Sequence, residues 1–263
     1  AVDTHLTQVS EVLQYFPGVQ WARRKLLEKA AEDYERFAAN QSSDDELQAE
    51  FGRATRRLGD VRRELGDLEG ALQAYFRAIS IFVELCRDPS PASDLVLDRA
   101  ASRTKAAIVL RELDQNDKAE HSYVVALDEL QSLVDGPEKT RSGVDALAVC
   151  LYDLSLLLYN IGRVEQAEEK LREALGHFEE LVDAYPAERW FRYELANARM
   201  THGQIIGRRG DAERATEMLQ RAIEEFESLG EADPDHPKYV EGRADGRLAL
   251  AEMLRTLGRD NDE

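Results

Sequence analysis

The chain has 263 residues, of which 43% are hydrophobic, 33% are charged and 7% are aromatic. Its formal net charge of −18 at pH 7 opposes binding to nucleic acid and to anionic membrane surfaces, because both would repel an acidic protein. The two cysteines, Cys86 and Cys150, each lie in an apolar run, so we interpret them as small buried hydrophobic residues and not as a disulfide.

A short motif that recurs with a 48-residue period organises the chain. In its clearest copy, the turn residue Gly162 is followed by Ala167, which begins an apolar stripe. Steps of one period lead to equivalent turn and stripe positions at Gly66, Asp114, Gly210 and Gly258, and at Ala71, Ala119 and Ala215. Apolar residues follow the alanine at offsets of 7, 8, 11 and 14, which is one face of an α-helix. The pattern predicts an all-α solenoid, in which each unit buries its apolar face against its neighbours.

The predicted elements follow this grid in chain order. Residues 1–43 hold a short amphipathic piece and a helix from Trp21 to Ala39, which we expect to cap the array. Residues 44–236 are expected to form four helix pairs, as units 44–91, 92–139, 140–186 and 187–236. Their helices are expected at 44–65 with 68–87, 94–113 with 116–134, 140–161 with 164–184, and 187–209 with 212–229. Residues 237–263 are expected to form a C-terminal cap, made of a helix at 237–257 and a polar tail.

Helix starts can also be read from the residues. Ser43 or Asp44 can cap the first helix of unit one, and Ser93 with Asp94 can do the same in unit two.

No run approaches the about 20 apolar residues that a membrane span needs. The chain begins at Ala1 and not at Met, so we expect a part excised from a longer protein.

Each unit resembles a tetratricopeptide (TPR) repeat. In unit one the matching positions are Leu58, Gly59, Gly66, Ala71, Tyr75 and Ala78. The usual TPR period is about 34 residues, so with the longer period found here both helices of each pair would gain about two turns. The resemblance implies a right-handed superhelix of antiparallel helix pairs that acts as a protein-interaction scaffold.

The N-terminal third carries a narrower resemblance. Residues 1–11 (AVDTHLTQVSE), 17–37 (PGVQWARRKLLEKAAEDYERF) and 44–75 (DDELQAEFGRATRRLGDVRRELGDLEGALQAY) resemble the TPR tails of certain bacterial Ser/Thr protein kinases. In such proteins a kinase domain is typically followed by one membrane helix and then by the tail. The resemblance implies a regulatory or sensory domain, on the cytoplasmic or the extracytoplasmic side of a membrane. The sequence contains no Gly-rich phosphate loop, no His-Arg-Asp and no Asp-Phe-Gly, so we expect no kinase chemistry in it.

The sequence offers no other catalytic constellation. The five histidines fall in different units, and none forms the pair with glutamate that zinc hydrolases use. The glycines near Gly203 do not follow a predicted strand, so they do not match a nucleotide-binding motif. The acidic cluster Glu165, Glu168, Glu169 and Glu173 is interpreted as a solvated helix face. We therefore expect no catalytic residue, metal or cofactor, while a small-molecule or enzymatic groove stays open as an alternative.

The TPR resemblance implies that the first helix of each unit lines a concave groove. The family's ligand-contact positions map to fourteen candidate partner-binding residues: Arg53, Arg56 and Arg63 in unit one, Thr104, Ile108 and Arg111 in unit two, Tyr152, Leu156, Tyr159 and Asn160 in unit three, and Asn197, Met200, Gln204 and Arg208 in unit four. The expected groove is basic at one end and apolar and aromatic in the middle. It would suit a protein or peptide partner, without nucleic acid and without direct membrane contact.

The first helix of unit three, residues 144–161, is apolar almost all round. Such a helix is expected to be covered on every side. Either a bound peptide, a partner subunit or one of the chain's own termini covers it, or the array itself buries it, and the sequence leaves these alternatives open. In the preferred hypothesis an apolar segment with acidic residues docks on Tyr152 and Tyr159 and meets Arg56, Arg63 and Arg111. A homodimer formed through the same helix is the alternative.

Overall fold

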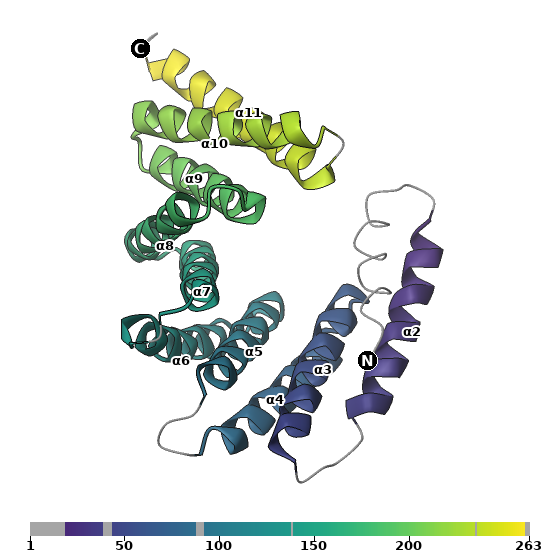
Figure 1. Ribbon diagram of the computed structural model, residues 1–263. Helices are drawn as coiled ribbons and strands as arrows, with labels where there is room; N and C mark the ends of the chain where they lie inside the picture. Colours follow the sequence, from purple (N-terminus) through teal and green to yellow (C-terminus); the bar gives the residue numbers. More distant parts are fainter. Residues whose placement is uncertain (1–18, 39–43, 88–91, 138, 235, 261–263) are drawn as a thin grey trace. The chain divides into compact units, whose positions relative to one another are not determined.

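The computed structural model describes residues 19–38, 44–87, 92–137, 139–234 and 236–260. These residues form α-helices joined by short turns, with no strand among them (Figure 1). The amphipathic piece expected before Pro17 lies outside the described residues. The helices are α2 (Gln20–Ala38), α3 (Asp45–Glu64), α4 (Leu68–Leu85), α5 (Ser93–Glu112), α6 (Asn116–Asp135), α7 (Arg141–Asn160), α8 (Val164–Ala184), α9 (Arg189–Arg208), α10 (Ala212–Ala232) and α11 (Pro237–Asp260).

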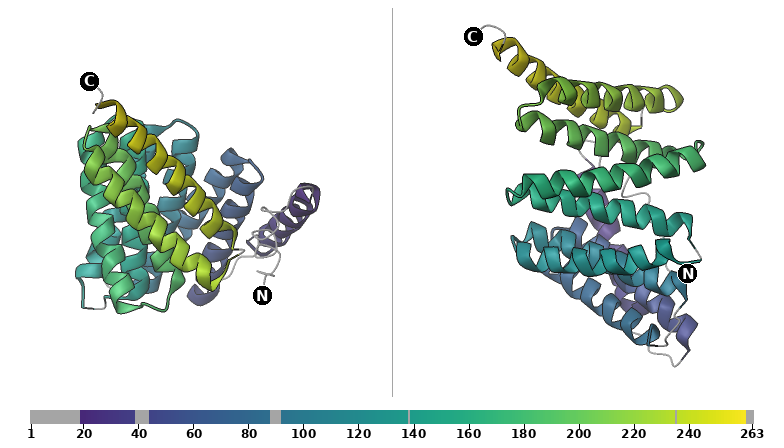
Figure 2. Two further views of the ribbon diagram at one scale, coloured as in Figure 1. Left: turned by 90° about the horizontal axis from the view of Figure 1, so that it is seen from above. Right: turned by 90° about the vertical axis from the view of Figure 1, so that its left-hand side faces the viewer.

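The chain divides into two compact units, residues 1–146 and residues 147–263. The first contains α2 to α6 and the beginning of α7, and the second contains the rest of α7 and α8 to α11. In the first unit α2 to α6 each pack against the next helix along the chain, and in the second unit α8 to α11 do the same (Figure 2). Three of the expected pairs pack together within a unit, namely α3 with α4, α5 with α6, and α9 with α10, and the two helices of each pair run antiparallel (Figure 1).

The turn inside each helix pair has the same backbone geometry in all four copies. Its central residue has a positive φ, which is 81° at Gly66, 56° at Asp114, 83° at Gly162 and 93° at Gly210. The next residue donates its N–H five residues back, as from Arg163 to the carbonyl of Leu158 at 2.8 Å. This is the Schellman ending of a helix, which favours glycine because an L side chain strains this conformation. The second helices therefore begin at equivalent positions of the repeat, namely Leu68, Asn116, Val164 and Ala212.

The core lies where the second helices press into small residues of the first helices. A Cβ atom on Gly59 of α3 would lie 2.5 Å from the ring of Tyr75 in α4, which is too close for any side chain. Gly203 of α9 is equally tight, because a Cβ there would lie 2.9 Å from Leu219 of α10. The alanines that open the stripes of the second helices are fully buried, namely Ala71, Ala119, Ala167 and Ala215. Short side chains thus let the paired helices approach closely over their whole length.

Several helix ends differ from the sequence-based bounds by up to three residues. The largest differences are that α10 continues to Ala232 and α11 to Asp260, instead of ending at 229 and 257. Gly230 follows the expected end of α10, but it lies inside the last helical turn, and the helix ends where Asp233 donates to the carbonyl of Leu229 at 3.3 Å. A glycine weakens a helix by only about 1 kcal/mol, which packing outweighs.

The expected helix caps are correct at one of two sites. The Asp44 carboxylate accepts a hydrogen bond from the N–H of Leu47 at 3.1 Å and caps α3. In unit two, however, Ser93 is already the first residue of α5, and Ala92 takes the cap position without a side-chain hydrogen bond. The cap expected from Ser93 and Asp94 is therefore wrong. The Asp94 carboxylate instead faces Arg53 of α3, with 3.3 Å between Oδ2 and the guanidinium.

Both cysteines are free thiols. Cys150 is buried inside α7, as the sequence suggested, whereas Cys86 at the end of α4 is only half-buried. Burial raises the pKa of the Cys86 thiol above its ordinary value.

One helix bears on the expectation that no run is long enough to span a membrane. Among the described residues, α7 alone is long and apolar enough to do so, with a mean hydropathy of 1.4 over its best window. More than half of that window, 56%, is buried inside the protein. A core helix of a globular protein satisfies the same criterion, so its composition alone is weak evidence for a membrane helix.

Candidate protein-binding surfaces

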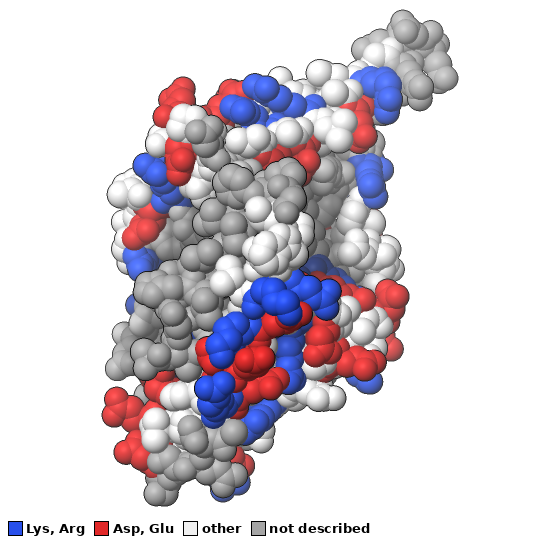
Figure 3. All heavy atoms as spheres, turned by 90° about the vertical axis from the view of Figure 1, so that its right-hand side faces the viewer, with Lys and Arg blue, Asp and Glu red and all other residues white. Residues whose placement is uncertain are grey.

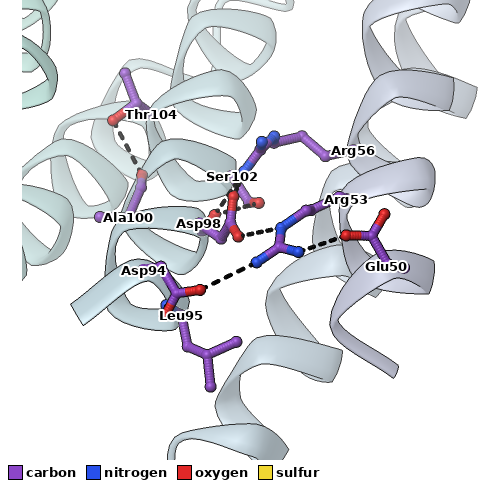
Figure 4. Close-up of polar contacts among 9 residues, drawn as sticks. All are labelled: Glu50, Arg53, Arg56, Asp94, Leu95, Asp98, Ala100, Ser102 and Thr104. Carbon is purple, nitrogen blue, oxygen red and sulfur yellow. Dashed lines mark hydrogen bonds and ion pairs between the residues drawn. The ribbon is translucent and has the colours of Figure 1, made fainter. Parts of the chain in front are cut away.

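The predicted basic residues at the start of the array form ion pairs within the protein. Arg53 of α3 donates to Asp98 of α5 at 2.7 Å and to Glu50 at 2.5 Å (Figure 4). Arg56 donates to the other oxygen of Asp98, also at 2.7 Å. One carboxylate therefore joins two guanidinium groups from the neighbouring first helix. The side chain of Asp98 is only 13% exposed.

The same two helices are linked again near their other ends. Arg63 binds both oxygens of Glu112, with nitrogen–oxygen distances of 2.5 to 3.2 Å. These hydrogen bonds raise the pKa of Arg63 despite its partial burial. Lys105 lies 3.3 Å from Asp60, whose carboxylate also accepts a hydrogen bond from the Tyr75 hydroxyl at 2.8 Å. Each predicted arginine of unit one therefore already has a carboxylate partner, and this surface is not an open basic patch.

Charges are also paired locally on the outer surface. On the face that Figure 3 shows, acidic and basic side chains of the described residues lie interspersed. On α2, for example, Lys25 lies 2.6 Å from Glu28, and Lys29 lies 3.0 Å from Asp33. Such exposed pairs contribute little to stability, because water and salt screen the charges. They nevertheless break up the acidic surface that the net charge would suggest.

In the second compact unit, residues 147–263, the chain itself covers most of α7. Its buried leucines are Leu147, Leu151, Leu154, Leu157 and Leu158, all at most 4% exposed. A narrow stripe stays half-buried, and it consists of the predicted residues Tyr152, Leu156 and Tyr159, together with Val149. The apolar character of α7 thus serves mainly the core, while one side of the helix stays partly open.

The open side of α7 is tied to α9. The Tyr152 hydroxyl lies 3.2 Å from the Thr201 hydroxyl, and burial raises the pKa of Tyr152 to about 12. The guanidinium carbon of Arg208 lies 5.2 Å from the centre of the Tyr159 ring, which is a cation–π contact. Two tyrosines of α7 therefore each contact a residue of the neighbouring first helix, α9.

The remaining predicted residues divide by exposure. Thr104 is buried and donates its hydroxyl to the carbonyl of Ala100 at 3.1 Å, so the structure does not place it on a surface. Gln204, Arg208 and Asn160 are exposed, whereas Ile108, Arg111, Asn197 and Met200 are half-buried. The predicted residues of α7 and α9 thus share a surface within the second unit. The predicted arginines of α3 are instead paired with Asp98 and Glu112 of α5, which were not among the predicted residues.

A buried charge cluster between α8 and α9 was not expected. Glu168 is 6% exposed, so its assignment to a solvated face is wrong. It accepts a hydrogen bond from Arg172 at 2.9 Å and a second, short one from Arg209. Burial pushes the pKa of Glu168 upward, but the two arginines outweigh it and leave the pKa below its ordinary value.

His202 lies beside this cluster and is 3% exposed, with its Nε2 atom 3.9 Å from Glu168. Burial lowers its pKa, although the nearby carboxylate acts in the opposite direction. Within the described residues, no group of three or more His, Cys, Asp or Glu is placed to hold a metal ion. The cluster therefore has the composition of a structural ion pair inside the second unit.

Comparison with known proteins identifies the fold. No protein-family model matches the sequence, and no curated protein matches it. Among solved structures, BtubC from P. vanneervenii is similar with a TM-score of 0.57 and 19% identity, over 91% of each chain. A Rap protein in complex with Competence and Sporulation Factor is similar with a TM-score of 0.62 and 17% identity. That match covers 93% of this chain but only 63% of the Rap chain.

A third similar structure is a kinesin light chain of Podosopora anserina with nearly identical TPR-like repeats. Its TM-score is 0.53 at 16% identity, over 82% of this chain and 90% of the other. These low identities speak for the fold and not for a shared activity. The chain is an all-helical solenoid of the TPR type.

Proposed function

We propose that this chain is a non-catalytic scaffold that binds a protein or peptide partner on the surface shared by α7 and α9. The observation that carries the proposal is the half-buried stripe of Tyr152, Leu156 and Tyr159 beside the exposed Arg208. Partly exposed aromatic and aliphatic side chains next to an arginine are typical of the residues that dominate protein-binding energies. A Rap protein of similar fold was solved with Competence and Sporulation Factor bound, which offers an analogy at the level of the fold.

The chemistry of the surface suggests the ligand. The apolar stripe favours a segment with two or three apolar side chains spaced along it. The exposed guanidinium of Arg208 can bind a carboxylate of the ligand while it stays in contact with the Tyr159 ring. We therefore propose a mixed apolar and acidic segment as the ligand.

The arginines of unit one have a different role in this proposal. Arg56 and Arg63 hold Asp98 and Glu112, so a partner's carboxylate would first have to displace an internal one. Such a displacement returns the internal carboxylate to water and adds little to the binding free energy, because one ion pair replaces another. We assign these arginines to the packing of α3 against α5.

From the sequence resemblance alone, we also propose that the domain belongs to a protein related to Ser/Thr kinases and serves as its regulatory or sensory part. Crosslinking of the parent protein in its native cells, followed by mass spectrometry, tests this assignment. A parent protein without a kinase domain would contradict it, and would leave the proposed binding surface unaffected.

The binding surface can be tested with peptides selected against the 263-residue chain from a random phage library. Selected peptides are labelled, and their dissociation constants are measured by fluorescence anisotropy. We expect Arg208→Glu and Leu156→Ala each to raise the dissociation constant about tenfold, which corresponds to about 1.4 kcal/mol. The matched controls are Arg57→Glu and Val124→Ala, which change exposed residues in the first unit.

Circular dichroism shows whether each variant keeps its helices. The proposal fails if the selected peptides bind both variants as tightly as the unmodified chain. It also fails if the control substitutions weaken binding to the same extent.

A further inference from the structure

The last helix, α11, is fixed to the second unit by one face only. A Cβ atom on Gly242 would lie 2.6 Å from the Phe226 ring, and one on Gly246 would lie 2.9 Å from Ile223. Both partners belong to α10, so α11 packs closely against that helix. Tyr239 and Ala249 are buried on the same face, at 8% and 6% exposure. These contacts therefore define the position of α11 on α10.

The opposite face of α11 carries a stripe of exposed apolar residues, beside Arg247, whose guanidinium pairs with Glu227 of α10. Val240 is 42% exposed, Leu248 62% and Leu254 50%, and Ala244 and Ala251 are exposed between them. These residues follow one another at steps of three or four, which is one stripe of a helix. In Figure 2, α11 is the last helix of the second unit and runs beside α10. No helix of the described residues of this unit lies on the stripe.

The 48-residue grid shows what this face resembles. Ala244, Ala251 and Leu254 correspond to Ala196, Gly203 and Ile206 in α9. In α9 these three positions are buried, and Gly203 receives Leu219 of α10. The exposed stripe of α11 therefore repeats the face that holds a helix elsewhere in the same fold, including its small residues. Small residues let two helix axes approach to about 8 Å.

Two charged residues indicate which kind of helix can pack on this stripe. Glu241 lies seven residues before Leu248, and Arg255 lies seven residues after it, and both are exposed. Neither makes an ion pair in the described part of the chain. If two copies of α11 lie antiparallel and cross at Leu248, each Glu241 faces the Arg255 of the other copy. The alanines of one copy then lie opposite those of the other, so the stripe is complementary to itself.

We infer that α11 pairs with α11 of a second copy of this chain, in an antiparallel two-fold contact centred on Leu248. One helix per copy offers less area than the about 1,200 to 2,000 Å² of stable interfaces. The dimer is therefore reversible, and it dissociates on dilution. This contact is separate from the surface of α7 and α9 and does not depend on the function proposed for it.

Sedimentation equilibrium of the 263-residue chain over a dilution series tests the inference. We expect a monomer–dimer equilibrium whose dissociation constant rises at least tenfold in Leu248→Glu. The control Val124→Glu places the same charge on an exposed valine of α6 and leaves the equilibrium unchanged. Leu248 is 62% exposed, so its substitution leaves the packing of α11 intact, which thermal unfolding confirms.

Charge reversal tests the antiparallel register. Glu241→Arg alone and Arg255→Glu alone each place like charges opposite each other, and each raises the dissociation constant threefold or more. The double variant Glu241→Arg, Arg255→Glu restores both pairs, and its dissociation constant returns to that of the unmodified chain. A chain that stays monomeric up to about 1 mM overturns the inference. A dimer insensitive to Leu248→Glu, or a double variant without rescue, overturns it as well.

Discussion

Substituting alanine for Gly162 isolates the backbone strain of the repeated turn. Gly162 has a φ of 83°, and an added Cβ would meet no atom within 4 Å, so the substitution creates no clash. Its N–H still donates to the carbonyl of Tyr159 at 3.0 Å, provided that the left-handed conformation is kept. The effect on stability therefore comes from the backbone conformation alone.

The expected size follows from two opposing contributions. A left-handed conformation costs an L residue about 1 to 2 kcal/mol. Alanine recovers roughly 0.5 to 1 kcal/mol, because it loses less conformational freedom on folding than glycine does. We expect Gly162→Ala to lower the free energy of unfolding by about 1 kcal/mol. Gly176 is the matched control, since it lies inside α8, also with open space around it. There alanine is the better helix former, and Gly176→Ala raises the free energy of unfolding by about 0.5 to 1 kcal/mol.

Urea unfolding followed by circular dichroism measures both variants. Because helical repeats do not always unfold in one step, hydrogen exchange of the amides of Arg163 and Ala167 reports the turn directly. Both substitutions add the same methyl group, so effects of opposite sign can come only from the backbone conformation at each site. If Gly162→Ala is as stable as Gly176→Ala, the turn is not strained and the reasoning is wrong.

Three further predictions concern the contacts inside each unit. Asp98→Asn leaves Arg53 and Arg56 without their shared carboxylate and lowers the stability of the first unit by about 1 to 2 kcal/mol, seen as faster hydrogen exchange in α3 and α5 but not in α10. Gly59→Val forces a side chain against the Tyr75 ring and costs at least about 1 to 3 kcal/mol in urea unfolding, whereas Gly230→Ala, with open space around it, costs nothing. The depressed pKa of His202 means that the unfolded chain binds this proton more readily, so stability falls as the pH drops below about 6.5. Unfolding at pH 7.5 and 5.5 checks this, because His202→Gln should show a smaller fall than the unmodified chain, and an equal fall would assign the pH dependence to other groups.

The helices were predictable because each boundary has a local cause. Gly66, Gly162 and Gly210 mark left-handed helix endings, and the apolar stripe of each second helix starts at a fixed distance from them. Asp44 caps α3 through its own side chain. Such signals lie within a few residues of the feature that they determine. The ends of α10 and α11 were less accurate, because both helices continue past the glycines near their expected ends, Gly230 and Gly258.

The contacts of charged side chains were harder to predict. Glu168 looks like a surface glutamate among others, and its partner Arg209 comes 41 residues later, from the next helix pair. The pairs of Arg53 and Arg63 have the same character, since their carboxylates lie 45 and 49 residues further on. The only signal in the sequence for these ion pairs was a separation of about one period between the two partners. Residues one period apart lie at equivalent positions of neighbouring repeats. Apolar spacing within one helix does not reveal it.

The identical turns also bear on how such a chain can change its length during evolution. The turns at Gly162 and Gly210 have the same backbone conformation and the same hydrogen bonds, and they lie one full period apart. A genetic crossover between them adds or removes one complete helix pair and leaves both junctions unaltered. A gain or loss of one or two residues inside a helix would instead rotate the following apolar stripe away from its neighbour, by about 100° for each residue. Whole helix pairs are therefore the steps by which this protein can lengthen or shorten.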